Sequence, residues 1–177
     1  MHSITALDQV AGGFTGSAVT IGKFDGIHLG HQKLIQELSS AAQEHAIQSV
    51  VVTFDRHPDA LLKPGHAKLP LIGPTQKHDL IEAQGADILV TLPFDERLAQ
   101  LDPKQFVQLI LVDGLRAKIV LVGEDFRFGN KGAGDVDLLR ELGQQLGFEV
   151  RVVSSEMLDG VKISSSAIRE ALDRGDV

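Results

Sequence analysis

The sequence predicts one α/β domain built on a Rossmann-like, doubly wound parallel sheet of five strands. Short apolar segments alternate with longer amphipathic segments along the chain, and the apolar segments are not interrupted by alternating polar residues. Such strands are typical of a parallel sheet that is covered by helices on both faces. The 177 residues are enough for one sizeable core, so we expect a single domain over 1–177. Right-handed crossovers predict the order 3-2-1-4-5, with strands numbered along the chain.

The expected strands are short runs rich in Val, Ile and Leu. They span residues 18–22, 49–54, 87–92, 118–122 and 149–153. Residues 50–52 are three consecutive valines, which is typical of a strand buried on both faces. The lead-in at residues 1–17 contains three glycines and is expected to be a loop or a weak edge strand.

Helical periodicity indicates five helices and one short helical turn. The helices are expected at 28–45, 75–84, 103–113, 135–146 and 166–174, and the turn at 95–100. Thr75 is the expected N-cap of its helix, which Gly85 ends. Asp102 is the expected N-cap of the next long helix, with Pro103 at its first position. Gly147 ends the helix that precedes the last strand.

Two loops carry residues that suit a ligand site. Residues 55–74 contain four prolines and are expected to be an irregular segment of the kind that often forms a lid. Residues 123–134 form a loop with four glycines after the fourth strand. Ligands of doubly wound sheets bind at the carboxyl ends of strands at the topological switch point, here between the first and fourth strands. The loops after these strands are the richest in Gly, Asp and His or Arg, so motif and topology indicate one crevice.

Composition and charge argue against several classes of protein. The net charge of −7 argues against a general nucleic-acid binder, which would show a basic face. The chain has no cysteine, hence no disulfide or thiolate site, which fits a reducing cytoplasm. Residues 1–16 lack the features of a signal peptide, and no stretch approaches the roughly 18 apolar residues of a membrane helix. We expect a cytoplasmic protein with no nucleic-acid or membrane partner.

The first strand leads through two glycines into a helix that begins with two histidines. Gly22 and Gly26 allow tight turns after the strand. His28 and His31 share a helix face, with Gly30 between them. A helix N-terminus favours phosphate, and a glycine lets a ligand approach the backbone. Two histidines at this spacing alone are equally consistent with a structural role, but the strand–loop–helix context favours a phosphate site.

Three later stretches each allow a structural and a functional interpretation. Residues 53–58 read Thr-Phe-Asp-Arg-His-Pro, which alone predicts a surface turn. Residues 123–129 read Gly-Glu-Asp-Phe-Arg-Phe-Gly, where two aromatic rings either pack the loop or bind a planar ring beside an arginine. Residues 163–169 read Ile-Ser-Ser-Ser-Ala-Ile-Arg. One serine suffices to cap a helix, whereas a serine cluster with an arginine one turn later also suits phosphate.

Together these stretches resemble the bacterial FAD synthetase family. The string Ile-Gly-Lys-Phe-Asp-Gly-Ile-His-Leu-Gly-His at residues 21–31 is similar to the H-x-G-H signature of nucleotidyltransferases and, more narrowly, to that of bifunctional riboflavin kinase/FMN adenylyltransferases. The likeness is to their amino-terminal module and covers nearly the whole chain. Ser166 stands where the family's motif has Thr, and Asp55-Arg56 stands where members often have Glu-Pro, which leaves the role of Arg56 open.

The resemblance implies an FMN adenylyltransferase with ATP and FMN as substrates and Mg²⁺ held mainly by their phosphates. The catalytic residues that it implies are His28, His31 and Arg169. It implies ATP contacts from Gly22, Phe24, Asp25, Gly26, Gly30, Ser164, Ser165 and Ser166. It implies FMN contacts from His57, Pro58, Asp125, Arg127 and Phe128, whereas Phe126 is expected in the core. No residues have the spacing of a protein metal site, so no metal ligand is assigned.

Two alternatives stay open from the sequence. Another H-x-G-H enzyme, of the cytidylyltransferase or pantetheine-phosphate adenylyltransferase type, would share the histidines and the serine–arginine motif. A flavin-nucleotide binding module without turnover is the alternative from a different class. The family's bifunctional members carry a carboxy-terminal riboflavin kinase module, and we expect this chain to lack it, because the sequence stops at Val177.

Overall fold

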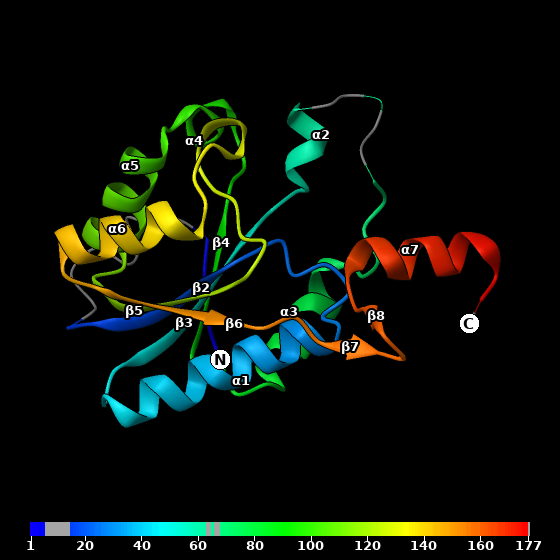
Figure 1. Cartoon of the computed structure of the whole chain (residues 1–177), viewed down its shortest axis with the longest axis horizontal. Coiled ribbons are helices and arrows are strands. Elements are labelled where there is room, and N and C mark those ends of the chain that lie inside the picture. Colours follow the sequence, from blue (N-terminus) through cyan, green and yellow to red (C-terminus); the bar gives the residue numbers. More distant parts are fainter. Residues whose placement is uncertain (6–14, 63–64, 66–67, 177) are drawn as a thin grey trace.

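The computed structural model describes residues 1–5, 15–62, 65 and 68–176. These residues form a parallel sheet of six strands in the order β1-β4-β3-β2-β5-β6 (Figure 1). The strands are β1 (His2–Ile4), β2 (Ser17–Ile21), β3 (Gln48–Phe54), β4 (Ile88–Leu92), β5 (Ala117–Gly123) and β6 (Glu149–Val153). The order predicted for five strands is confirmed, but the count of five is wrong. The lead-in, expected to be a loop or a weak edge strand, contributes β1, which pairs with β4 and forms one edge of the sheet. Residues 6–14 of the lead-in lie outside the described residues.

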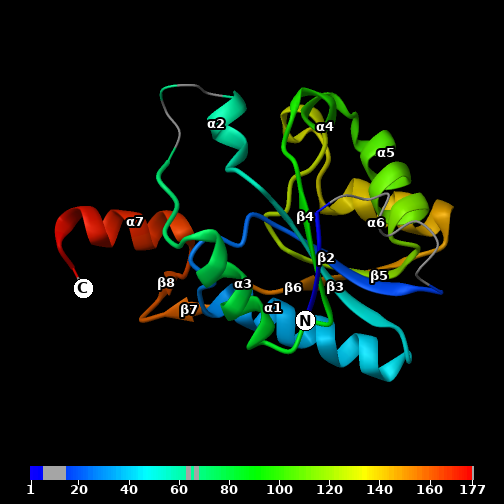
Figure 2. The same cartoon turned by 180° about the vertical axis from the view of Figure 1, so that it is seen from behind.

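Helices cover both faces of the sheet (Figures 1 and 2). On one face lie α1 (Leu29–Glu44) and α3 (Pro74–Glu82), whose buried residues join one apolar cluster with strand residues such as Val51. On the other lie α5 (Pro103–Phe106), the π-helix η2 (Val107–Gly114) and α6 (Val136–Leu146). The central strands β2, β3, β4 and β5 are largely buried on both sides, which explains their mainly apolar sequences.

Several helices begin after a side chain that caps them, but two predictions about the helices are corrected by the structure. Asp102 forms a reciprocal capping box with Gln105, at 2.8 and 3.1 Å, as a capping residue should. The helix expected over 103–113 nevertheless continues as a π-helix from Val107. Thr75 is not an N-cap, because Pro74 already occupies the first helical turn and Gly73 precedes it. The helix α4 (Glu96–Gln100) is capped by Asp95, and α6 by Asp135.

Two segments contain secondary structure that was not predicted from the sequence. The stretch 55–74, expected to be irregular, includes the short helix α2 (Pro58–Leu62). After β6, the strands β7 (Met157–Leu158) and β8 (Val161–Lys162) form a hairpin. Its two turn residues, Asp159 and Gly160, both have positive φ, and an Asp-Gly pair is a known signal for such a turn. Within the described ranges, no helix has the length and apolar character needed to cross a membrane.

Candidate active site

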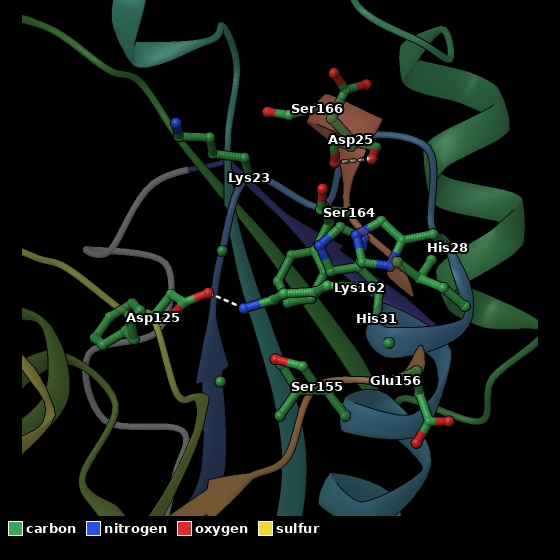
Figure 3. A pocket seen from close by; sticks show the side chains of 18 of the residues that line it. Lys23, Asp25, His28, His31, Asp125, Ser155, Glu156, Lys162, Ser164 and Ser166 are labelled. Carbon is green, nitrogen blue, oxygen red and sulfur yellow. Dashed lines mark hydrogen bonds and ion pairs between the residues drawn. The ribbon is translucent and has the colours of Figure 1, made fainter. Parts of the chain in front are cut away.

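A cavity of about 370 Å³ lies at the carboxyl ends of β2 and β5, where the sequence predicts the ligand crevice. Six segments meet there: the loop after β2, the start of α1, the segment after β3, the loop after β5, the segment after β6, and the start of α7 (Ser165–Arg174). Figure 3 shows side chains from several of these segments around the cavity. Parallel strands that are neighbours place their carboxyl ends at the same edge, so distant motifs converge on one site.

The two predicted catalytic histidines stack against each other at the start of α1. The ring centroids of His28 and His31 are 3.7 Å apart, and Phe24 packs edge-on against His31 at 5.2 Å. His28 is the N-cap residue of α1, but its side chain does not cap the helix. Both rings line the cavity. Among the described residues, neither Nδ1 atom has a hydrogen-bond partner, although both atoms are buried. The pair is therefore held by packing and keeps hydrogen-bonding capacity for a ligand.

Burial sets the charge state of these histidines. It lowers the pKa of His31 to about 3, helped by the adjacent His28, and it lowers the pKa of His28 as well. Both rings are consequently neutral at pH 7. A neutral imidazole offers one N–H donor and one acceptor, and stacked rings this close disfavour two positive charges.

Arg169 lies in the cavity wall, with most of its donors bonded to protein. It pairs with the carboxylate of Asp25 and donates to the carbonyl of Leu69 at 3.0 and 3.3 Å and to that of Ser165 at 3.2 Å. Asp25 is only 6% exposed, and its other carboxylate oxygen accepts the Leu71 N–H at 2.8 Å. Both predicted residues are thus at the site, where they bond to each other.

The three predicted serines have three different partners at the start of α7. The Ser164 hydroxyl caps the helix by accepting the Ala167 N–H at 3.1 Å, so the helix begins at Ser165, one residue before the expected start. The Ser165 hydroxyl donates to the carbonyl of Asp25 at 2.8 Å. The Ser166 hydroxyl lies 3.5 Å from the Lys68 ammonium. Capping therefore involves one serine, and the other two join α7 to the segments that surround the cavity.

In the loop after β5, the two phenylalanines lie in different surroundings, although both contact the core cluster. Phe128, expected to contact FMN, is buried in the core against Phe106 at 5.9 Å and does not line the cavity. Phe126, expected in the core, is half-buried, stacks on Phe128 at 5.5 Å and lines the cavity. The backbones of Phe128 and Gly134 pair, and the Phe128 ring packs on Gly134 so closely that a Cβ there would lie 2.7 Å from the ring. Arg127 lies outside the cavity lining and pairs with Asp135 at 3.5 Å.

The remaining predicted residues divide between the cavity and its surroundings. Gly22 and Gly30 line the cavity, as does Asp125, which forms an ion pair with Lys162 (Figure 3). Gly26 does not line it, and neither does Pro58, which begins α2.

His57 lies in the wall between this cavity and a second one. The second cavity also measures about 370 Å³, and the two share Lys23, Asp25, His57 and Lys68. Burial, together with the charge of Lys23, lowers the pKa of His57. Lys77 also lines the second cavity, and burial lowers its pKa.

Three lysines of the first cavity were not predicted from the sequence. Lys23, Lys68 and Lys162 all contribute to its walls. Lys23 lies inside the predicted motif and Lys162 directly precedes the serine motif, so their positions were available as a signal. The lysines offer a local positive charge that the net charge of −7 conceals.

The carboxylates around the first cavity are bonded to protein groups. Glu156 pairs with Lys33 at 2.7 Å, and Glu124 accepts the Ser155 hydroxyl at 3.0 Å. A separate group on α3, formed by His78, Asp79 and Glu82, has suitable spacing for a metal but does not line the cavity. Its Glu82 already accepts the amino terminus at 2.7 Å.

Comparison with known proteins adds to this geometry. Residues 13–167 match the family model described as FAD synthetase. The chain belongs to the FAD synthetase family. The match includes the histidine pair, the loop after β5 and the serine motif through Ala167.

Curated relatives in this family are longer than the chain. A Pseudomonas fluorescens protein is 36% identical over 176 residues, which are 99% of this chain and 56% of that protein. An Escherichia coli K12 protein is 36% identical over 157 residues, or 89% of this chain and 50% of that protein. Both are named bifunctional riboflavin kinase/FMN adenylyltransferase. The chain therefore spans about half the length of the FAD synthetases that it matches.

Solved structures support the same fold. A Streptococcus pneumoniae protein described as a macrolide-efflux protein superposes with a TM-score of 0.87 at 29% identity, over 99% of this chain and 58% of its own. A pantoate–β-alanine ligase from Francisella tularensis superposes with a TM-score of 0.63 at 14% identity, over 96% of this chain and 73% of its own. At that identity, the second likeness concerns the fold of this FAD synthetase family member alone.

Proposed function

We propose that this chain is an FMN adenylyltransferase, which transfers AMP from ATP to FMN and yields FAD and pyrophosphate. The observation that supports it most is the position of the stacked His28–His31 pair. The pair faces Arg169 and the start of α7 across a single cavity, in a chain of the FAD synthetase family. We assign the chain to the adenylyltransferase part of its longer relatives, because these motifs belong to that part. A cytoplasmic location is part of the proposal and is compatible with the absence of cysteine.

The reaction needs no covalent enzyme intermediate. A phosphate oxygen of FMN attacks the α-phosphorus of ATP, and the bond from that phosphorus to the bridging oxygen of the β-phosphate breaks. The bonding electrons leave with pyrophosphate. The nucleophile is already an anion, so the protein has to position the reactants and stabilise charge.

Each group of cavity residues has a distinct task in this proposal. His28 and His31 are neutral near pH 7 and donate hydrogen bonds to the phosphate oxygens at the reacting centre. The start of α7, with Ser165, Ser166 and Arg169, binds the β- and γ-phosphates and stabilises the leaving pyrophosphate.

Mg²⁺ fits this site as a group that the substrates bring with them. The cavity carboxylates Asp125, Glu124 and Glu156 are bonded to Lys162, Ser155 and Lys33 respectively. Such an arrangement suits an ion held mainly by phosphate oxygens, with few protein ligands. When bound, the ion neutralises part of the triphosphate charge.

The test is incubation with ATP, FMN and Mg²⁺, followed by chromatography of the products. We expect FAD and pyrophosphate, with loss of most turnover in His28→Ala and little change in His45→Ala, a matched control at the exposed end of α1. Riboflavin in place of FMN should yield no FAD, because it lacks the attacking phosphate. Release of pyrophosphate from CTP but not ATP would indicate a different nucleotidyltransferase. Tight FAD binding without FAD formation would indicate a binding module.

A further inference from the structure

Asp25 bonds to two separate parts of the structure at once. One carboxylate oxygen accepts the Leu71 N–H at 2.8 Å, and the other pairs with Arg169. Asp25 lines both cavities and is 6% exposed. It is well suited to hold other groups in place.

Residues 68–72, which we name the strap, are fastened over the boundary between the two cavities. Besides the bond from Leu71 to Asp25, the Leu69 carbonyl accepts two donors from Arg169, at 3.0 and 3.3 Å. The side chain of Leu71 packs on Gly26 so closely that a Cβ there would lie 2.9 Å from the leucine Cδ1. Lys68, Pro70 and Ile72 line the second cavity.

Arg169 cannot grip a phosphate with two parallel donors while it keeps every present bond. A guanidinium has five N–H groups. Four are used, by the Leu69 carbonyl twice, by Asp25 and by the Ser165 carbonyl. A two-point phosphate contact therefore requires the loss of one of them. The Leu69 carbonyl is a neutral acceptor on a residue that is 85% exposed, whereas Asp25 is a buried charge. An anionic phosphate replaces the carbonyl more readily than the carboxylate.

We propose that Asp25 is a positioning residue that keeps Arg169 directed into the first cavity while a bound polyphosphate replaces the Leu69 carbonyl. Nucleotide binding then loosens the strap and uncovers the second cavity. The proposal rests on the proposed function for the nature of the ligand, a nucleoside triphosphate. The exchange of acceptors itself needs only a polyphosphate.

Hydrogen exchange of the Leu71 amide tests the proposal in the unmodified protein. The probes are inorganic tripolyphosphate and an ATP analogue with a methylene bridge between the α- and β-phosphorus atoms, both with Mg²⁺. Binding is measured separately by calorimetry. We expect each bound probe to accelerate exchange of this amide by about fivefold or more, the lower end of typical coupling between sites. Bound ligands usually slow exchange, so the sign is diagnostic. Unchanged or slower exchange in the bound protein, or failure of both probes to bind, would overturn the proposal.

Two variants separate positioning from simple support of the fold. Asp25→Asn leaves Arg169 without its charged partner and should weaken tripolyphosphate binding by roughly fivefold or more. Leu71→Ala keeps the N–H but loses the packing on Gly26, which loosens the strap. Because coupling is reciprocal, this variant should bind tripolyphosphate more tightly. Leu172→Ala, on an exposed site of α7, is the matched control and should bind as the unmodified protein does.

The outcomes distinguish this inference from the proposed function. If both Asp25→Asn and Leu71→Ala weaken binding, Asp25 only supports the fold, and the inference fails. If Asp25→Asn does not fold, Leu71→Ala and the exchange measurement still decide the matter. FAD formation without acceleration of Leu71 exchange refutes the inference and leaves the proposed function intact. Accelerated exchange without FAD formation refutes the proposed function alone.

Discussion

Acidification should destabilise this protein through His31. Burial lowers its pKa from 6.5 to about 3 in the folded protein, whereas the unfolded chain keeps the ordinary value. Between these two pH values the unfolded state binds more protons. The free energy of unfolding therefore rises with pH across this window and falls as the pH drops below about 6.5. His28 contributes with the same sign, because burial lowers its pKa too.

The size of the effect follows from proton linkage. One proton bound only by the unfolded state changes the free energy of unfolding by about 1.4 kcal/mol per pH unit. From pH 6.5 to about pH 4.5, His31 alone accounts for roughly 2 kcal/mol, because the unfolded chain is only half protonated at the upper end of this range. This change is a large part of the free energy of unfolding of a typical domain, which is about 5–15 kcal/mol.

Urea unfolding of the unmodified protein and His31→Asn, measured at several pH values between about 7.5 and 4.5, tests this. Other groups titrate in both proteins, so the difference between the two slopes isolates His31. Below pH 6.5, the free energy of unfolding of the unmodified protein should fall more steeply than that of His31→Asn, by up to about 1.4 kcal/mol per pH unit. His2→Asn replaces an exposed histidine and should follow the unmodified protein. Parallel curves for the unmodified protein and His31→Asn below pH 6.5 would refute the reasoning.

Other predictions concern catalysis and the backbone. His28→Ala and His31→Ala should each lower the rate of FAD formation by roughly 10²-fold, which is the loss typical of removing one hydrogen-bond donor to the transition state. The circular dichroism spectrum should stay unchanged. Unchanged turnover in either variant would show that this histidine does not act in the reaction. Gly129→Ala should destabilise the fold by on the order of 3 kcal/mol, because φ is +72° and a Cβ would lie 2.8 Å from the Pro103 nitrogen. Gly147→Ala, at φ +84° with nothing within 4 Å of the added Cβ, should lower the free energy of unfolding by only about 1 kcal/mol. Thermal unfolding of both glycine variants measures the difference.

Periodicity predicted the centre of the sheet well, because the central strands are buried on both faces. Val50, Val51 and Val52 are fully buried, and three adjacent β-branched apolar residues are typical of a central strand. The edge strand β1 and the hairpin of β7 and β8 are harder to predict. Each has only two or three residues, and several of these are exposed. The π-helix after Phe106 has the same apolar character as an α-helix, so its sequence does not reveal the change of pitch.

The motifs predicted which segments meet at the site. They predicted less well where each side chain of those segments points. His28, His31, Asp25 and Arg169 all lie in the cavity wall, because strand order brings their segments together. The Phe128 ring packs against Gly134, six residues later, and against Phe106. That choice is a matter of tertiary packing, and the alternation of two phenylalanines around an arginine is compatible with either outcome.

The state of charge at the site connects these observations. The histidines are neutral because they are buried against each other, and Arg169 is neutralised by Asp25. Lys162 is likewise paired with Asp125, and Lys33 with Glu156. In the proposed function, a triphosphate that binds to Arg169 or Lys162 has to compete with the acceptors that these two cations already have. Displacing the Leu69 carbonyl from Arg169 would free the strap, and displacing Asp125 from Lys162 would free the loop after β5. Binding would therefore rearrange both segments.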